Sequence, residues 1–241
     1  MRLQVFLAQS GVASRRASAD LIRDGHVAVN GKIVHEPGFH VQPESDRIAF
    51  RGQPIQFEKK EYFIFYKPTN VVTTASDEKG RKTVVDFFKK IKTRLYPVGR
   101  LDRNTTGILI MTNDGELANH LMHPRYGVVK KYVAVIDKPL SAEMMKKFKK
   151  GIYLESGITH AAHIHFIEEH SKGHAYEIHI HEGKNRQIRK MMEILEREVK
   201  FLHRFEYGPL NLGDLKPGEY RSITSEELKL LKKDTPQGSE S

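Results

Sequence analysis

The chain of 241 residues contains no cysteine. This absence excludes a disulfide framework and any zinc or iron–sulfur site built on thiolates. No apolar run approaches the roughly 20 residues that span a bilayer. Residues 1–4 lack the basic-then-apolar layout of a secretion signal. We therefore expect a cytoplasmic protein that does not engage a membrane.

Positive charge is abundant and unevenly distributed along the chain. The formal net charge is +10 and the pI is near 9.6. Residues 61–150 contain 18 Lys and Arg against 9 Asp and Glu, whereas residues 151–241 contain 13 against 15. A basic middle segment favours a polyanionic partner such as nucleic acid. Lysine-rich faces on ordinary surface helices are the alternative explanation.

The first 50 or so residues have the pattern of a small, separate unit. The apolar spacing of residues 3–7 predicts a short helix, and Ser14 is placed to cap a second helix that ends at Gly25. Asn30-Gly31 lies between two β-branched runs, which is a strong hairpin signal. We expect two helices and a hairpin in residues 1–55.

These residues resemble the ribosomal protein S4-like RNA-binding module. The matching segments are Arg2-Leu3, Ser14-Arg15-Arg16-Ala17, Gly25-His26-Val27 and Val29-Asn30-Gly31. The resemblance implies that the second helix and the hairpin turn present basic groups to RNA phosphates. The RNA-binding residues would be Arg2, Arg15, Arg16 and Lys32. The alternative is an accessory unit whose arginines are merely solvated.

Residues 52–61 have the composition of a linker, and a larger domain is expected over residues 56–234. Aromatic and β-branched runs predict strands at residues 62–66, 108–111, 132–136 and 176–180. Helical spacing and caps predict helices at residues 84–91, 114–124, 141–151, 188–195 and from 224 onward. This mixture indicates an α+β fold. We expect the tail, residues 235–241, to be disordered.

A polar loop at residues 97–107 precedes one of the buried strands. Catalytic residues concentrate on such loops. Arg100 and Arg103 flank Asp102 and offer guanidinium groups for phosphate contact. Taken alone, an aspartate in this setting is more often a turn residue bonded to nearby backbone.

The loop and three further segments resemble the motifs of pseudouridine synthases. They are Gly99-Arg100-Leu101-Asp102 with the following Thr105-Thr106-Gly107, Tyr66-Lys67-Pro68, Lys131-Tyr132 and the run from Gly183 to Arg189. Residues 112–119 and the S4-like N-terminus are similar to the RsuA/RluB-type branch, which modifies ribosomal RNA. Residues 117–124 favour its large-subunit members. The resemblance implies a mixed, mainly antiparallel sheet flanked by helices around a central cleft.

The resemblance also implies roles for individual residues. Asp102 matches the essential aspartate, which can attack the sugar, attack the base, or remove a ribose proton. Tyr132 matches a tyrosine that stacks on the flipped uracil, although a core aromatic on a strand has the same pattern. Arg189 matches an arginine that pairs with Asp102, with a planar fork able to hold both carboxylate oxygens. The alternative is a solvated helix residue, because Arg186, Arg189 and Lys190 would form a basic helix face.

Three other positions are expected to bind the substrate. Arg100 would assist base extrusion or phosphate binding, Leu202 would form an apolar floor under the base, and Lys67 would bind substrate or shape the loop before Pro68. No dinucleotide or P-loop fingerprint is present, and the reaction consumes no cofactor. The expected partner is ribosomal RNA or a ribosomal assembly intermediate. We expect a monomer with no obligate protein partner.

Two other classes of function compete with this interpretation. The pairs His163/His165 and His179/His181 each place two imidazoles on one strand face, a spacing that can bind a metal. No His-Glu-x-x-His motif accompanies them, and we expect solvated histidines and no metal. A non-catalytic RNA-binding or ribosome-assembly protein is the second alternative, and its function would not require Asp102.

Overall fold

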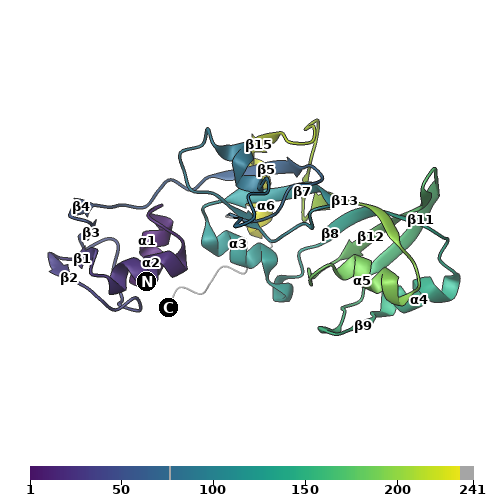
Figure 1. The fold of residues 1–241 in the computed structure, drawn as a ribbon, viewed down its shortest axis with the longest axis horizontal. Coiled ribbons are helices and arrows are strands. Elements are labelled where there is room, and N and C mark those ends of the chain that lie inside the picture. Colours follow the sequence, from purple (N-terminus) through teal and green to yellow (C-terminus); the bar gives the residue numbers. More distant parts are fainter. Residues whose placement is uncertain (76, 234–241) are drawn as a thin grey trace. The chain divides into compact units, whose positions relative to one another are not determined.

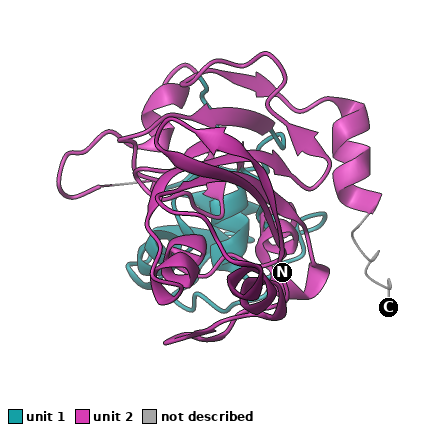
Figure 2. Cartoon of the chain, turned by 90° about the vertical axis from the view of Figure 1, so that its right-hand side faces the viewer, with its two compact units in different colours: residues 1–61, 91–94, 113–115 teal, residues 62–90, 95–112, 116–241 magenta. Residues whose placement is uncertain are grey.

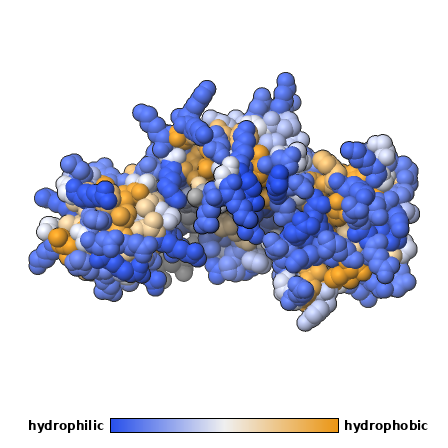
Figure 3. Space-filling model, viewed as in Figure 1, coloured by the Kyte–Doolittle hydropathy of each residue, from blue (hydrophilic) through white to orange (hydrophobic). Residues whose placement is uncertain are grey.

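The computed structural model describes residues 1–75 and 77–233, so the predicted disordered tail lies outside the described residues. The chain divides into two compact units (Figure 2). The first contains residues 1–61, 91–94 and 113–115, and the second contains residues 62–90, 95–112 and 116–241. Hydrophilic residues cover most of the face that Figure 3 shows, and apolar residues form smaller patches on it.

The first unit contains the predicted helix pair and hairpin (Figure 1). The helices are α1 (Leu3–Gln9) and α2 (Arg15–Arg23), and a sheet in the order β2-β1-β3-β4 is built from β1 (Val27–Val29), β2 (Lys32–Ile33), β3 (Ile48–Phe50) and β4 (Gln53–Pro54). The Ser14 side chain accepts a hydrogen bond from the Ala17 amide at 3.2 Å. Asn30 and Gly31 have φ of 52° and 80°, the left-handed values that a tight hairpin turn requires.

The prediction that residues 52–61 form a linker is wrong at its start. Gln53 and Pro54 are strand β4, which pairs with Phe50 and Ala49 of β3. Proline is tolerated there because β4 lies at the edge of this sheet.

The second unit is organised around one large sheet (Figure 1). Within the described residues this sheet has nine strands, with the main order β11-β12-β8-β13-β7-β5-β15. Strand β6 pairs with β7, and β14 pairs with β13. The strands are β5 (Tyr62–Lys67), β6 (Tyr96–Val98), β7 (Thr106–Thr112), β8 (Lys130–Ile136), β11 (His163–His170), β12 (Gly173–Ile180), β13 (Val199–Tyr207), β14 (Leu210–Asn211) and β15 (Tyr220–Ser222).

A small hairpin and several helices accompany the large sheet. The hairpin pairs β9 (Tyr153–Leu154) with β10 (Gly157–Ile158). The helices are α3 (Gly115–Met122), α4 (Ala142–Lys150), α5 (Gln187–Ile194) and α6 (Ser225–Lys233), with 3₁₀ turns at Val84–Phe88 and Pro124–Tyr126. The segment expected to be a helix to residue 91 is thus a shorter 3₁₀ turn, held by a reciprocal capping box between Thr83 and Asp86.

The sheet is mixed and mainly antiparallel, which confirms the predicted α+β class. Strands β13 and β7 form a parallel pair, with Arg204 opposite Gly107. They approach so closely there that a Cβ on Gly107 would lie 2.0 Å from the Arg204 carbonyl oxygen. Glycine is therefore required at this position, where φ is 116°. In the described part of the chain, no helix combines the length and apolarity needed to cross a membrane.

Candidate active site

A pocket of about 470 Å³ lies in the second unit, within the usual range for small-ligand sites. Its walls come from the β6–β7 loop, strands β8 and β13, and the segment between β12 and α5. The lining includes Arg100, Leu101, Asp102, Lys130, Tyr132, Glu182, Lys184, Arg186, Leu202, Arg204 and Tyr207. Segments that are far apart in sequence thus form one concave surface.

The loop that carries Asp102 is fixed by hydrogen bonds from a second segment, residues 67–73. Thr73 Oγ1 donates to the Leu101 carbonyl at 2.7 Å. The Asn70 amide donates to the Arg103 carbonyl at 2.8 Å. The Asp102 carbonyl closes a turn by accepting from the Thr105 amide at 3.0 Å. These bonds fix the backbone around Asp102, and its side chain keeps 28% of its surface exposed, so the carboxylate remains accessible.

Lys67 lies beneath this loop and is fully buried, so the prediction that it binds substrate is wrong. Its Nζ donates to the carbonyls of Pro68 at 3.0 Å, Thr105 at 2.8 Å and Arg103 at 3.4 Å. Burial lowers the pKa of Lys67 to about 8, with Asp102 opposing the shift and Arg204 adding to it. The alternative role, shaping the loop, is the one that this geometry supports.

Arg189 approaches Asp102 from helix α5 (Gln187–Ile194). Its Nε lies 3.9 Å from Oδ2 of Asp102, and its Nη1 donates to the Val199 carbonyl at 2.8 Å. Arg189 therefore does not make the expected pair of hydrogen bonds to the Asp102 carboxylate, because Nη1 bonds the Val199 carbonyl and Nε is 3.9 Å from Asp102. Burial, followed by Arg186, lowers the pKa of Arg189, while Asp102 opposes the change. Arg189 does not line the pocket.

Tyr132 and Leu202 lie on neighbouring strands in the pocket wall. Both side chains are almost entirely buried. Arg204 is directly opposite Tyr132 in the β8–β13 pairing and donates from Nη1 to the Tyr132 hydroxyl at 3.3 Å. Its Nε donates to the Ile108 carbonyl at 2.9 Å, which anchors it to β7. The phenol is thus held by a buried guanidinium.

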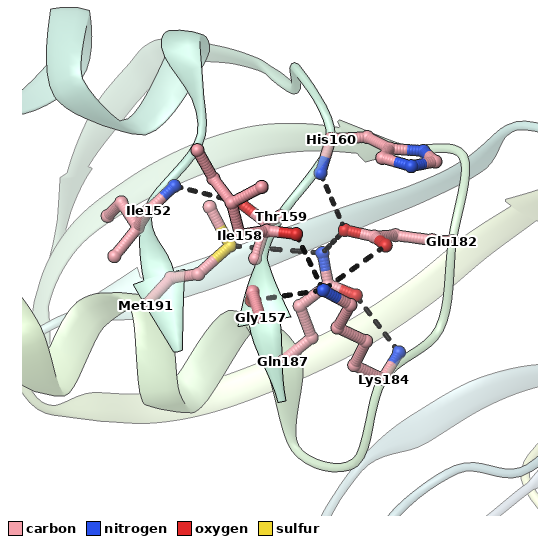
Figure 4. A network of polar contacts seen from close by, with 9 residues as sticks. All are labelled: Ile152, Gly157, Ile158, Thr159, His160, Glu182, Lys184, Gln187 and Met191. Atoms are coloured by element: carbon pink, nitrogen blue, oxygen red, sulfur yellow. Dashed lines mark hydrogen bonds and ion pairs between the residues drawn. The ribbon is translucent and has the colours of Figure 1, made fainter. Parts of the chain in front are cut away.

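The segment between β12 and α5 is held by a buried polar network (Figure 4). Glu182 accepts from Gln187 Nε2 and from the His160 amide, each at 2.8 Å. Lys184 Nζ donates to the carbonyls of Ile158 at 2.6 Å and Gly157 at 3.1 Å, both in the β9–β10 hairpin. This network fixes the pocket wall from Glu182 to Gln187.

Arg100 and Arg186 also line the pocket, and both are exposed. Arg186 precedes helix α5 with a left-handed φ of 51°. Its guanidinium lies 3.8 Å from Glu193. The predicted basic helix face of Arg186, Arg189 and Lys190 is wrong for Arg186, because that residue lies outside the helix. Its position in the pocket wall instead makes its charge available to a ligand.

The basic residues expected to bind RNA in the first unit are all exposed. They are Arg2, Arg15, Arg16 and Lys32. Arg15 and Arg16 open helix α2, and Lys32 follows the hairpin turn. All four side chains are therefore accessible to a polyanion.

Of the two histidine pairs expected from sequence, His163/His165 forms, with ring nitrogens 3.2 Å apart, and His179/His181 does not. His163, His165 and His179 lie together on the β11–β12 face, where His163 is opposite His179. His181 is elsewhere and contacts the Gly127 carbonyl at 2.8 Å. Within residues 1–75 and 77–233, no group of three or more His, Cys, Asp or Glu side chains could hold a metal ion.

Three buried polar residues of the pocket were not foreseen from sequence: Lys130, Glu182 and Arg204. Lys130 and Arg204 each lie two residues from a predicted site residue on the same strand, Tyr132 and Leu202 respectively. Strand alternation therefore carried a signal for both. Glu182 had no such signal, because it is held by the Gln187 side chain and by the His160 amide, which is distant in sequence.

Comparison with known proteins agrees with this arrangement of a pocket-forming sheet and a helix-hairpin unit. The chain belongs to the RNA pseudouridylate synthase family, whose model matches residues 61–194. The S4 domain model matches residues 1–48. The resemblance drawn from sequence motifs is thereby confirmed for both parts of the chain.

Individual relatives extend over almost the whole chain. Ribosomal large subunit pseudouridine synthase B of Bacillus subtilis is 46% identical and covers 96% of this chain and 95% of its own length. An uncharacterized RNA pseudouridine synthase of Aquifex aeolicus is 40% identical over 96% of this chain and 93% of its own. A crystal structure of a pseudouridylate synthase has a TM-score of 0.68 and 29% identity, covering 96% of this chain and 99% of that one.

Proposed function

We propose that this protein converts a specific uridine of large-subunit ribosomal RNA to pseudouridine, with Asp102 as the essential residue. The position of the Asp102 carboxylate carries the proposal, because it is accessible in a pocket also lined by Tyr132 and Leu202. The Bacillus subtilis relative supports the choice of large-subunit RNA. The protein acts in the cytoplasm as a monomer.

The reaction exchanges one bond of the nucleotide for another. The C1′–N1 bond breaks, the uracil turns, and C5 bonds to C1′, while C5 loses a proton and N1 gains one. The target base must leave its stack to reach the pocket, which costs roughly a few kcal/mol. Tyr132 offers a flat surface to the base and Leu202 an apolar one. Arg100, exposed at the pocket, contacts the flanking phosphate.

An Asp102→Asn substitution tests the central claim. It preserves shape but removes the anion, so we expect turnover below about one thousandth of wild type with RNA binding retained. Tritium release from RNA labelled at uridine C5 measures the reaction. Asp214→Asn, at an exposed position outside the pocket lining, is the matched control and should keep full activity. Appreciable turnover by Asp102→Asn would instead favour a non-catalytic RNA-binding protein.

Residues 1–55 form the RNA-binding module of this proposal, and residues 56–234 form the catalytic domain. Each phosphate contact contributes about 0.7–0.9 to the slope of log binding constant against log salt concentration. This slope is negative, and we therefore expect its magnitude to fall by about 2 when glutamine replaces Arg15, Arg16 and Lys32. A smaller change is expected from the control triple at the exposed positions Arg47, Arg51 and Lys59. Equal slopes in the two triples would remove the role of the α2–hairpin surface.

The substrate assignment has its own test. Pseudouridines mapped in ribosomal RNA from cells with and without the gene should differ at a large-subunit position. A difference confined to small-subunit RNA would overturn the assignment while leaving the chemistry intact.

A further inference from the structure

Lys130 is a buried cation in the pocket wall that the proposed reaction does not yet use. It lies on β8 two residues before Tyr132, so both side chains are on the same face of the strand. Only 6% of Lys130 is exposed. Its Nζ makes a long hydrogen bond, 3.4 Å, to the His181 carbonyl. Nζ also lies 5.3 Å from the centre of the Tyr207 ring. Burying an ammonium with these two weak partners is costly, and an apolar side chain would fill the space at lower cost.

The surroundings of the ammonium leave its charge poorly compensated. Glu182 attracts it, but this carboxylate already accepts two hydrogen bonds and lies 3.9 Å from Lys184 Nζ. Burial, followed by repulsion from Arg204, lowers the pKa of Lys130 to about 8, with Glu182 opposing the shift. The charged and titratable groups that line the same pocket are Arg100, Asp102, Tyr132, Glu182, Lys184, Arg186, Arg204 and Tyr207.

We propose that the Lys130 ammonium stabilises the negative charge that develops on the uracil as it separates from the ribose. This inference rests on the proposed function. When the C1′–N1 bond breaks, its electron pair passes to the uracil ring and spreads over the ring nitrogens and carbonyl oxygens. The ring then supplies a pair from C5 to C1′, a proton leaves C5, and N1 takes one up.

Lys130 keeps its own proton throughout this sequence. Its contribution is electrostatic, and it holds for each route open to Asp102, because in each the electron pair goes to the base. A fixed, buried cation acts strongly on charge that appears only during reaction. The role therefore predicts an effect on turnover and little effect on binding of the neutral uridine.

Two neighbouring lysines provide a matched comparison. Lys131 follows Lys130 in the strand, so its side chain lies on the opposite face, where it pairs with Glu206 at 2.8 Å. In single-turnover tritium release, we expect Lys130→Met to react about 100-fold more slowly than wild type and Lys131→Met to differ by less than about twofold. Lys130→Met should unfold at the same or a higher urea concentration, because it removes a buried charge.

The pH dependence separates this role from a structural one. The wild-type rate should fall as pH rises through about 8, where Lys130 loses its proton. Lys130→Arg should move that fall to higher pH, because a guanidinium stays charged. An unmoved fall would assign it to another group, such as Lys67, whose pKa is also about 8, and would overturn the inference.

The proposed function and the role of Lys130 can be contradicted separately. A wild-type protein that releases no tritium from ribosomal RNA contradicts the proposed function itself. An active wild type with an equally active Lys130→Met variant overturns the role of Lys130 and leaves the proposed function standing.

Discussion

Replacing Lys67 by methionine should separate stability from activity. The variant removes a fully buried charge whose pKa is lowered from 10.5 to about 8, which corresponds to about 3 kcal/mol in favour of the variant at neutral pH. It also leaves the Pro68 and Thr105 carbonyls without this donor, at a cost of about 1–3 kcal/mol each. The two effects nearly cancel, so we expect the free energy of unfolding to change by no more than about 3 kcal/mol.

Activity should respond differently, because the same hydrogen bonds hold the loop that carries Asp102. A displacement of about 1 Å at a reacting group can lower the rate about 100-fold. We expect a loss of that order in kcat with little change in KM, since Lys67 does not line the pocket. Single-turnover tritium release gives the rate, and Lys131→Met is the control. Wild-type turnover by Lys67→Met would refute the positioning role.

The sign of the pH effect offers a second check on Lys67. Its pKa in the folded protein is below that in the unfolded chain, so between about pH 8 and 10.5 the unfolded state binds more protons. The stability contributed through this group therefore rises with pH across that window, by up to about 3 kcal/mol, and the methionine variant lacks the rise. Lys130 is present in both proteins, so their difference in urea unfolding isolates Lys67. A pH-independent difference would contradict the assigned burial of charge.

The remaining predictions concern Arg189 and Gly107. Arg189→Lys should lower turnover about tenfold or more, because a compact ammonium lacks the separated nitrogens with which the guanidinium reaches the Val199 carbonyl and still lies near Asp102. Arg186→Lys should change it less than about threefold in the same single-turnover assay, and equal losses would argue against the Asp102 contact. Gly107→Ala should lower the free energy of unfolding by more than about 2 kcal/mol, since its Cβ would meet the Arg204 carbonyl and φ is 116°. An unchanged urea midpoint would contradict that close approach.

The sequence predicted correctly those elements that depend on interactions within a few residues. The Ser14 cap and the Asn30-Gly31 turn both depend on hydrogen bonds and backbone preferences within a few residues, so their positions could be predicted from sequence. The same holds for residues 176–180 of strand β12, whose buried and half-buried residues alternate as expected. The linker prediction failed at Gln53 because strand β4 exists only through its pairing with β3.

In the candidate site, too, the sequence determined some features and the tertiary structure determined the others. The sequence by itself determined the family, through ordered motifs around Asp102 and the S4-like N-terminus, and with them the segments that would meet. Only the tertiary structure decided how they meet. It placed Lys67 under the loop that carries Asp102. It put Arg189 in a hydrogen bond with the Val199 carbonyl and 3.9 Å from Asp102, and it brought Lys130, Glu182 and Arg204 into one wall. Burial and electrostatics at these positions depend on many neighbours that are distant in sequence, so no local sequence pattern can predict them.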